Sequence, residues 1–541
     1  MIEPEIQLFR CPPAAHLHLM VWALVVVPFA LSLAETIASG RRRGLAAPDF
    51  PSPLWQRCAW ASLGAGLAGI FLYGLAKDPL VDDASAAGVY WVAERFLAGL
   101  PMYPPLDGPE VYGLLYGPLT YLVYAAAIAT GYGMAATAVA GFLPGMLAAW
   151  ILVRMALAAR GRENRAIAAG LLAAAAGVFP VFWVYAKGDP YLLLLAAVAA
   201  ARKDARNGLA VTSACAGLAM NIKVTAGLCF LPILAHQTLV RRPPWTEAVM
   251  GLGTFALVFA APFLHPRITL SGYLDWVLLA GFHRIEWKSL LVNALIAAPF
   301  AWLGFALVRD RVWGSALGLS FGLLLGAASK IGAGYYHFLP LVPSLLARAA
   351  DAAAPDRRRA RLPASLLLAL SWAGVVAQVY LLLGPIQQNR GLDAAVKRDL
   401  RVLPPDAVVM TGWFRSSGKN VILAPQYDLP RRIENPGIPY LWNELSLSDL
   451  AEAGFQVPDA VRRRLAACEA RHLATPRGTA PWDWASVYPP HHHLLPEDTR
   501  GLLRERYRRV PDPRSGEAGA GYFDVWECGP ARAPEDGGKR R

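Results

Sequence analysis

Residues 54–83 read LWQRCAWASLGAGLAGIFLYGLAKDPLVDD and place a long apolar block directly before an acidic pair. The block from 54 to 76 has one charged residue, Arg57, and is long enough to cross the hydrocarbon layer of a bilayer as a helix. Similar blocks recur along the chain, in which 55% of the 541 residues are hydrophobic and 17% are charged. The sequence therefore predicts a polytopic α-helical membrane protein and excludes a soluble globular protein, a disordered chain and a coiled coil.

The apolar blocks predict about 12 membrane spans, several of them short. We expect them near residues 16–38, 54–76, 134–157, 166–186, 189–202, 208–223, 225–240, 246–264, 288–308, 312–330, 333–348 and 362–385. The first block has no basic leader, so it is expected to remain as an anchor. Short spans meet near Asp189, Lys223 and Lys330, where we expect broken or tilted helices.

Lys and Arg in short loops orient the spans, because basic residues concentrate on the cytoplasmic side. The chain has 52 of them against 39 acidic residues, a formal net charge of +13. Their clusters occupy alternate gaps between the predicted spans: Arg41-Arg42-Arg43, Arg160/Arg162/Arg165, Arg202/Lys203/Arg206, Arg241-Arg242, Arg309/Arg311 and Arg357-Arg358-Arg359/Arg361. The positive charge thus indicates membrane topology and not a nucleic-acid surface. The opposite gaps, and everything after Pro385, are expected outside the cytoplasm.

The run 112–130 does not fit this scheme as a span. It is apolar enough to cross, but a crossing there would put the Arg160 cluster outside and invert every later cluster. A juxtamembrane or re-entrant helix with tyrosines at the interface is therefore expected. We assign 1–385 to the membrane domain and 77–133 to its main outer loop.

Residues 386–528 predict a small extracytoplasmic α/β domain, and 529–541 a disordered tail. The domain is rich in proline and charge, and its strand-like runs alternate with helical ones. The expected strands are Ala407–Met410, Val421–Leu423 and Tyr522–Trp526, and the expected helices include Ser446–Ala453 and Asp459–Ala470.

The cysteines are few and divide between the two regions. Cys468 and Cys528 could pair if the C-terminal domain lies outside the cytoplasm, and the residues leave paired and free states equally open. Cys58, Cys215 and Cys229 lie in apolar blocks and are expected as small core residues.

The loop 77–133 is the first candidate for chemistry. From Lys77 to Val111 it has six acidic residues against two basic ones. Asp82 and Asp83 stand just beyond the 54–76 span, where partial shielding from water would raise a carboxyl pKa and suit the group to accept a proton. The spacing alone favours a plainer alternative, in which the pair caps the next helix.

Asp189 and Lys223 are further candidates, since each stands where apolar blocks meet. Asp189 precedes Pro190 at the start of a span, as a helix cap or as a site residue. Lys223 lies inside an apolar run, where a lysine is costly and suggests function with a phosphate or a carboxylate partner. The alternative is a lysine that snorkels from the end of a short span.

Two more outer corners offer side chains for a phosphate or a sugar. The loop 265–287 contains Arg284 and Glu286, and Lys330 is followed by Tyr335-Tyr336-His337. Arg or His could hold a phosphate and Tyr could stack on a sugar, although interface anchoring explains most residues of this kind.

The sequence does not support a zinc site or the common nucleotide-binding and hydrolase motifs. The His491-His492-His493 run lacks the ligand spacing of a zinc site, and no Cys-x-x-Cys accompanies it. Walker, Rossmann, GxSxG and HExxH motifs do not occur in the sequence. We therefore expect no metal and no cofactor.

The outer loop resembles the GT-C superfamily of integral-membrane glycosyltransferases, which includes the protein O-mannosyltransferases and the lipid A aminoarabinose transferases. The resemblance covers about residues 54–350 and rests on the order of weak motifs: Val81-Asp82-Asp83, Phe96-Leu97-Ala98-Gly99-Leu100-Pro101-Met102-Tyr103 and Tyr116-Gly117-Pro118-Leu119-Thr120-Tyr121. Asp189 matches a second acidic position, and Asn221-Ile222-Lys223-Val224-Thr225 is similar to a lysine-containing corner. Asp-Asp replaces the usual Asp-Glu, and Tyr-Gly-Pro replaces the Lys-Pro-Pro of the aminoarabinose transferases. That family's substrate therefore does not carry over.

The resemblance implies an enzyme of the bacterial inner membrane. It would transfer a sugar from a polyprenyl-phosphate donor, with inversion, to a hydroxyl of a glycan, lipid or protein at the outer face. Asp82 is implied as general base, with Asp83 as the other candidate. The implied substrate-binding residues are Asp189, Lys223, Arg284, Tyr103, Glu286 and His337. The lipid-linked sugar is a co-substrate, so the resemblance implies no metal or cofactor.

Two other functions fit part of the pattern. A transporter or lipid flippase would use Asp82, Asp189 and Lys223 near the midplane, but the acidic residues cluster in an outer loop and no paired interrupted helices mark matching halves. A membrane scaffold that presents the C-terminal domain as a binding module is the third, although that domain shows no recognisable site.

Overall fold

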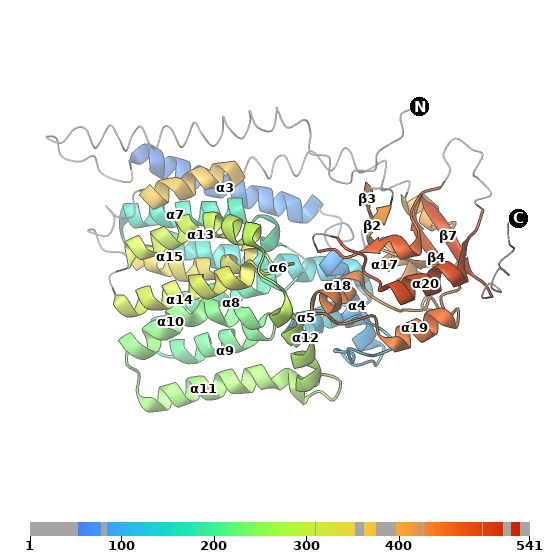
Figure 1. The fold of residues 1–541 in the computed structure, drawn as a ribbon. Coiled ribbons are helices and arrows are strands. Elements are labelled where there is room, and N and C mark those ends of the chain that lie inside the picture. The colour runs from blue at the N-terminus through green and yellow to red at the C-terminus, as the bar shows by residue number, and fades with distance from the viewer. Residues whose placement is uncertain are drawn as a thin grey trace, which may run out of the picture.

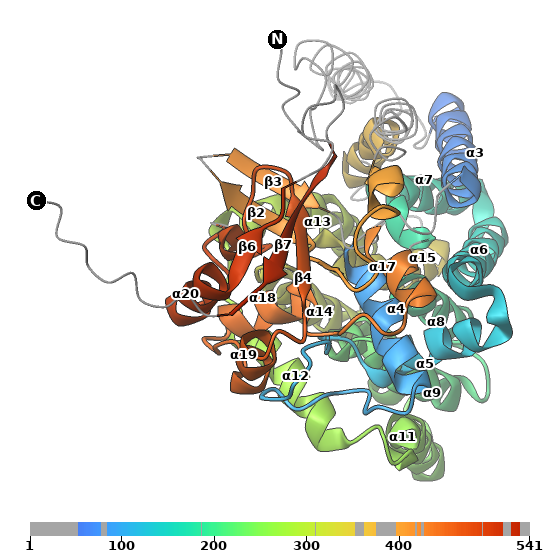
Figure 2. The ribbon, with the colours of Figure 1, turned by 90° about the vertical axis from the view of Figure 1, so that its right-hand side faces the viewer.

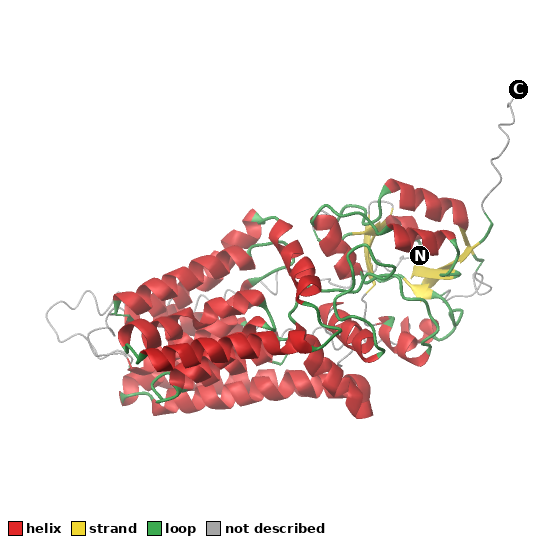
Figure 3. Cartoon of the chain, turned by 90° about the horizontal axis from the view of Figure 1, so that it is seen from below, coloured by secondary structure: helices red, strands yellow, loops and turns green. Residues whose placement is uncertain are grey.

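A helical bundle adjoins a smaller region that contains the strands (Figures 1 and 3). The structure is a computed structural model that describes residues 52–76, 84–184, 187–308, 310–351, 362–374, 396–416, 419–423, 427–488, 491–511 and 521–530. Among these residues, 5 helices are long and apolar enough to cross a membrane: Pro53–Leu75, Ala135–Ala158, Trp245–Leu264, Trp287–Leu307 and Arg311–Ala328. The predicted fold class, a polytopic helical protein with a small C-terminal α/β region, is confirmed.

The bundle helices follow the predicted spans closely. They are α3 (Pro53–Ala76), α6 (Gly133–Ala158), α7 (Gly161–Val178), α8 (Asp189–Ala201), α9 (Gly208–Met220), η4 (Val224–Phe230), α10 (Leu231–Ala235), η5 (His236–Val240), α11 (Trp245–Ala260), η6 (Ala261–Leu264), α13 (Trp287–Leu307), α14 (Arg311–Ala328), η7 (Tyr335–Leu341), α15 (Val342–Asp351) and a helix at Leu362–Gly374. The helix α12 (Leu270–Phe282) lies in the segment 265–287, which was predicted as an outer loop. Every predicted span from 54–76 onward overlaps at least one of these bundle helices. The span predicted at 16–38 lies outside the described residues.

The helix α7 lies at the centre of the bundle, because small side chains let its neighbours come close. Every residue from Ala166 to Gly177 is buried, and most of them are alanine or glycine. The helices α3, α6 and α15 pack around it. Small residues at helix contacts are the usual means of close packing within a membrane, where no hydrophobic effect drives helices together.

The helices break near Lys223 and Lys330, as predicted. The helix α9 ends at Met220, and Asn221-Ile222-Lys223 separates it from η4. The helix α14 ends at Ala328, and η7 begins only at Tyr335. Non-helical backbone within a helical membrane domain is tolerated where it is buried in protein or lines a cavity. Both breaks are therefore candidate positions for a functional site.

The apolar run 112–130 does not form a single spanning helix. Its helix, α5 (Pro118–Ala127), has 10 residues and continues into η2 (Ile128–Tyr132). Ten helical residues rise about 15 Å, half of a hydrocarbon layer of about 30 Å. The helix α5 packs against α4 (Ala84–Leu97), which follows the predicted acidic pair.

The C-terminal region contains two small sheets and several helices. One sheet has the order β1 (Val408–Val409), β4 (His472–Pro476), β7 (Phe523–Cys528), β6 (Tyr507–Arg509), in which β1 and β4 are parallel and the other pairs antiparallel. The other has the order β3 (Lys419–Leu423), β2 (Gly412–Ser416), β5 (Trp484–Ala485). The helices are α17 (Leu429–Glu434), α18 (Glu444–Glu452), α19 (Asp459–Ala466) and α20 (Glu497–Arg506), with η9 at Pro481–Asp483.

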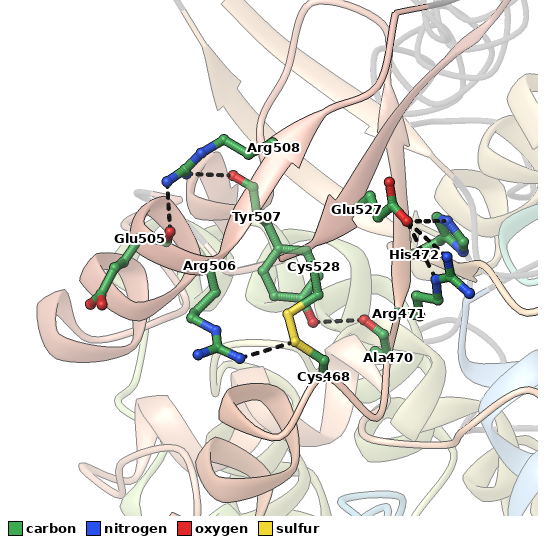
Figure 4. Close-up of a disulfide and its surroundings, with 10 residues drawn as sticks. All are labelled: Cys468, Ala470, Arg471, His472, Glu505, Arg506, Tyr507, Arg508, Glu527 and Cys528. Atoms are coloured by element: carbon green, nitrogen blue, oxygen red, sulfur yellow. Dashed lines mark hydrogen bonds and ion pairs between the residues drawn. A yellow bond between two sulfur atoms is a disulfide. The ribbon is translucent and has the colours of Figure 1, made fainter. Parts of the chain in front are cut away.

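A disulfide between Cys468 and Cys528 ties the loop after α19 to the end of β7 (Figure 4). The pairing that the sequence left open is thus present. Beside it, the Tyr507 hydroxyl donates to the carbonyl of Ala470 at 2.7 Å. Of the other cysteines, Cys215 and Cys229 are buried and Cys58 is half-buried, in agreement with their prediction as small core residues.

The strand-containing region shares a hydrophobic core with the loop 84–133. The helices α4, α5, α12 and α18 lie between the bundle and the sheets (Figures 1 and 2). Val111 forms an isolated parallel bridge with Trp442, and Asn443 N donates to Val111 O at 2.7 Å. The side chain of Trp276 from α12 and that of Leu447 from α18 belong to the same buried cluster. The C-terminal region is therefore seated directly on the predicted outer loop.

Candidate functional site

Motifs from distant parts of the sequence meet at Asn221-Ile222-Lys223. Gly117 N donates to Ile222 O at 2.8 Å, and Leu119 N donates to Asn221 O at 2.9 Å. A Cβ atom on Gly117 would lie 2.3 Å from Asn221 O, and one on Gly188 would lie 2.1 Å from Ile222 Cγ2. Glycine is needed at both positions for this approach. The Tyr-Gly-Pro turn, the Gly-Asp corner and the lysine corner thus form one unit.

Lys223 and Asp189 make a buried ion pair at this point. The Lys223 Nζ lies 2.7 Å from Asp189 Oδ1, and the two side chains are 9% and 3% exposed. The same Nζ lies 4.4 Å from the centroid of the Tyr336 ring and 5.5 Å from that of Tyr116. Asp189 Oδ2 is buried, and it has no hydrogen-bond partner in the described part of the chain. Lys223 does not snorkel, and Asp189 does not cap its own helix by a side-chain hydrogen bond.

A cavity of about 360 Å³ lies beside Lys223 at the junction of the bundle and the C-terminal region. We call it the junction cavity. Its wall includes Tyr116 from the loop before α5, His283 after α12 and Asp449 of α18, with many apolar side chains between them. Pockets of this size with a few charged groups on apolar walls are the usual form of a small-molecule site.

Lys330 is the second lysine on the wall of the junction cavity. Its Nζ donates to the carbonyls of Ala280 at 2.5 Å and Gly281 at 3.2 Å, in the last turn of α12. An isolated bridge between Ile285 and Lys330 joins the segments that follow α12 and α14. The two breaks in the bundle thus bring two ammonium groups to one cavity.

Of the predicted substrate-binding residues, Asp189, Lys223 and His337 lie together. His337 lines the junction cavity, and its Nδ1 is 3.4 Å from Thr225 Oγ1. A much smaller space of about 10 Å³ is lined by all three of these residues. The lysine and histidine therefore belong to both spaces.

Tyr103, Arg284 and Glu286 do not line the junction cavity. The buried Tyr103 donates from its hydroxyl to the carbonyl of Tyr116 at 2.9 Å, so it holds the loop that presents Tyr116. Arg284 is 58% exposed and pairs with Glu452 at 3.2 Å. The Glu286 carboxylate accepts from Ser289 Oγ at 2.5 Å at the start of α13.

The predicted general base lies outside the described residues. Asp82 and Asp83 immediately precede Ala84, the first residue of α4. Among the residues that the structure does describe, no three His, Cys, Asp or Glu side chains come together in a way that could hold a metal ion.

Asp449 is a cavity residue that the sequence did not reveal. The Tyr488 hydroxyl donates to its Oδ1 at 2.6 Å, and His283 Nε2 lies 3.6 Å from the same oxygen. Burial raises the pKa of Asp449 to about 6, although His283 and the hydrogen bond from Tyr488 oppose the rise. Nothing in the run ELSLSDLAE distinguishes this carboxylate from those of a helix exposed to solvent.

No protein-family model matches this chain, and no curated protein matches it. A similar solved structure is the crystal structure of ArnT from Cupriavidus metallidurans bound to undecaprenyl phosphate. That likeness has 12% sequence identity and a TM-score of 0.49, and covers 86% of this chain and 97% of that chain. A likeness at 12% sequence identity concerns the fold alone, so the function is inferred below from the residues of this chain.

Proposed function

We propose that the chain is an integral-membrane glycosyltransferase of the GT-C type, which transfers a sugar from a polyprenyl phosphate to a hydroxyl acceptor. The observation that carries this proposal is the buried Lys223–Asp189 ion pair, whose lysine lines the junction cavity. A lysine is costly inside a membrane domain and is expected to serve an anionic ligand or an ion path. Two of the motifs that resemble the GT-C superfamily, the Tyr-Gly-Pro turn and the corner at Asp189, contact the segment that contains this lysine, which favours the phosphate.

The proposed reaction is a single displacement at the anomeric carbon. The acceptor O–H bond breaks and a new C–O bond forms, while the bond between the anomeric carbon and the phosphate oxygen breaks. Inversion follows from one displacement. Lys223 and Lys330 would stabilise the charge that develops on the leaving polyprenyl phosphate, an effect of several kcal/mol in a site that excludes water. The apolar walls would accommodate the lipid.

The acceptor proton is proposed to pass to Asp82, with Asp83 as the other candidate. This assignment rests on the resemblance, in which an acidic pair follows a span. Asp189 would keep Lys223 in place, since it holds the ammonium at 2.7 Å. His337 would bind substrate from the same wall.

The reaction is proposed to occur at the outer face of a bacterial inner membrane. The Cys468–Cys528 disulfide supports this orientation, because disulfides persist in oxidising compartments. The helix α8 begins with Asp189 beside Lys223, and it leads toward Lys203, which pairs with Asp351 at 2.7 Å. The basic loop is thus separated from the cavity by the length of α8, as the charge rule requires.

The proposal is tested with purified protein, a panel of polyprenyl-phosphate sugars and membrane extract as the source of acceptor. The wild-type chain should release polyprenyl phosphate. The double variant D189N/K223Q removes both charges of the pair and should lower release by about 100-fold or more. K288Q changes an exposed lysine at the start of α13 and is the matched control.

Two outcomes have distinct meanings. Full turnover in D189N/K223Q would overturn the proposed phosphate site. Full turnover in both D82N and D83N would remove the acidic pair from the mechanism and leave the phosphate site intact.

A further inference from the structure

The C-terminal region supplies one side of the junction cavity. Leu445 and Asp449 reach it from α18, and Tyr488 from the segment after β5. Asp449 is 3% exposed. A carboxylate at such a position is costly to bury unless its charge serves a partner. The groups that contact Asp449 therefore indicate which partner its charge serves.

The contacts of Asp449 fix one of its two carboxylate oxygens, and the residue lines the junction cavity. Both Tyr488 and His283 approach Oδ1, at 2.6 Å and 3.6 Å. The described residues offer no hydrogen bond to Oδ2. An ionised carboxylate can accept at both oxygens, so Oδ2 retains its capacity for a donor on a ligand.

His283 is held so that its second nitrogen faces this carboxylate. Its Nδ1 lies 3.2 Å from the carbonyl of Ile331, which can only accept, so Nδ1 is assigned as the donor. The side chain is 3% exposed, and its ring packs edge to face on that of Tyr488. Asp449 thus sits in a fixed frame made by the bundle and the C-terminal region together.

Gly332 keeps Tyr488 in this frame. Its φ is +78°, and a Cβ atom there would lie 2.5 Å from Cε1 of the Tyr488 ring. The loop after α14, which brings Lys330 to the cavity, therefore packs directly on the tyrosine that bonds Asp449. This contact fixes the position of Asp449 relative to the loop of Lys330. We call the wall with Lys223 and Lys330 the lysine side of the cavity and the wall with Asp449 the carboxylate side.

The two sides differ in the ligands they can accept. Lys223 and Lys330 attract a phosphate, whereas the charge of Asp449 disfavours any anion next to it. A neutral hydroxyl can donate a hydrogen bond to Oδ2, and hydrogen bonds to a charged acceptor are among the stronger ones.

We propose that Asp449, framed by His283 and Tyr488, forms the acceptor subsite and accepts a hydrogen bond from a neutral hydroxyl of the acceptor. This inference rests on the proposed function and adds the class of group that is bound: the acceptor presents a hydroxyl there, and not a phosphate or a carboxylate. Asp449 binds and orients the acceptor, while the lysine side holds the donor phosphate.

The test separates donor binding from transfer in the purified full-length protein. Polyprenyl phosphate without a sugar is the binding probe, and release of polyprenyl phosphate from donor sugars in the presence of extract measures transfer. D449N should bind the probe within about twofold of the wild type and lose transfer by about 100-fold, because a misplaced acceptor forfeits orientation. D459N changes an exposed carboxylate of α19, 79% exposed, and should behave as the wild type.

A second variant guards against a folding defect in D449N. Y488F keeps the ring and removes only the hydroxyl that fixes Oδ1; it should lower transfer by about 10-fold and leave probe binding unchanged. Wild-type transfer in both D449N and Y488F would overturn the inference. Loss of probe binding in D449N to the level of D189N/K223Q would also overturn it, because Asp449 would then serve the donor side. If D189N/K223Q itself keeps probe binding and transfer, the proposed function fails.

Discussion

Lys223 and Asp189 lie 2.7 Å apart inside the protein, and removal of either one leaves the other charge buried without it. Breaking a buried pair on one side typically costs about 3–5 kcal/mol, whereas neutral replacement of both partners costs much less. We therefore expect K223M to lower the thermal unfolding midpoint sharply and D189N/K223Q to lower it little. Thermal unfolding in one detergent, with K288M as the control, measures both. Equal midpoints for K223M and wild type would mean that the pair is not formed.

Asp449 should make the protein less stable as the pH rises. Its pKa is raised from 3.8 to about 6, so the folded state holds the proton more tightly than the unfolded state. Stability then falls as the pH rises from about 4 to about 6, by about 3 kcal/mol in all. The facing groups are His283, Tyr488 and, at longer range, Tyr121. D449N removes this penalty, so its midpoint should rise above that of the wild type at pH 8 and approach it near pH 4.

The direction of this pH dependence also distinguishes a ligand-binding role of Asp449 from a role in stabilising the fold. A carboxylate whose charge stabilises the fold would make D449N less stable than the wild type where the group is ionised, whereas one kept for a ligand lowers the stability of the wild type there. D459N, which changes an exposed carboxylate, should show no pH-dependent difference from the wild type.

At the scale of elements, the contact between the turn before α5 and the corner after α9 determines where Lys223 points. A Cβ atom on Gly117 would meet the backbone oxygen of Asn221 at 2.3 Å, and backbone cannot rotate away as a side chain can. G117A should therefore displace the corner and lower both polyprenyl phosphate binding and transfer by about tenfold or more, as a small misplacement does. G326A in α14 has open space around the new methyl group, so it should be neutral or slightly stabilising. Wild-type probe binding in G117A would contradict this role.

The sequence predicted the membrane elements well because their physical signal is strong. An apolar block of span length with loop charges at alternate ends leaves few alternatives, and the breaks near Lys223 and Lys330 followed from charges inside apolar runs. The run 112–130 was harder, since composition does not show that its helix begins only at Pro118. The disulfide could not be predicted from the sequence, because the spacing of Cys468 and Cys528 does not show whether they come together in the fold.

The site was only partly predictable because motifs give order along the chain and not direction in space. Lys223, Asp189 and His337 were found since a charged or polar group in an apolar run is conspicuous. Tyr103 belongs to a motif but points into a buried cluster, where it supports Tyr116. Asp449 lies on α18, where residues around the helix are buried on more than one face, so no periodic pattern marks it.

At the scale of the whole molecule, the proposed orientation predicts which surfaces a membrane-impermeant thiol reagent reaches. Cysteines introduced as D459C on α19 and R162C at the start of α7 stand at exposed positions in the two regions. In intact cells D459C should be labelled, and R162C only after the membrane is permeabilised. The wild-type chain supplies the background from its own cysteines. The opposite pattern would invert the topology.

The disulfide should stabilise the C-terminal region and, through it, the side of the junction cavity that contains Asp449. Cys468 and Cys528 are 60 residues apart, and closing such a loop typically contributes about 2–5 kcal/mol. The double variant C468S/C528S should lower transfer more than it lowers binding of polyprenyl phosphate, because Lys223 belongs to the bundle and Asp449 does not. Equal loss of both activities would contradict this division.

The shared wall of the junction cavity has a consequence for the order of biogenesis. The ribosome makes Lys223 and Lys330 long before it makes Asp449 and Tyr488. In the proposed orientation, the C-terminal residues then cross the membrane and fold before they reach the bundle. A nascent chain therefore possesses the lysine side of the cavity while the opposite side is still missing. In that interval it could hold a lipid phosphate without being able to position a hydroxyl against it. Under the proposed function, folding of the C-terminal region then completes the acceptor side of the cavity, so that a lipid-linked sugar is not discharged before the acceptor side exists.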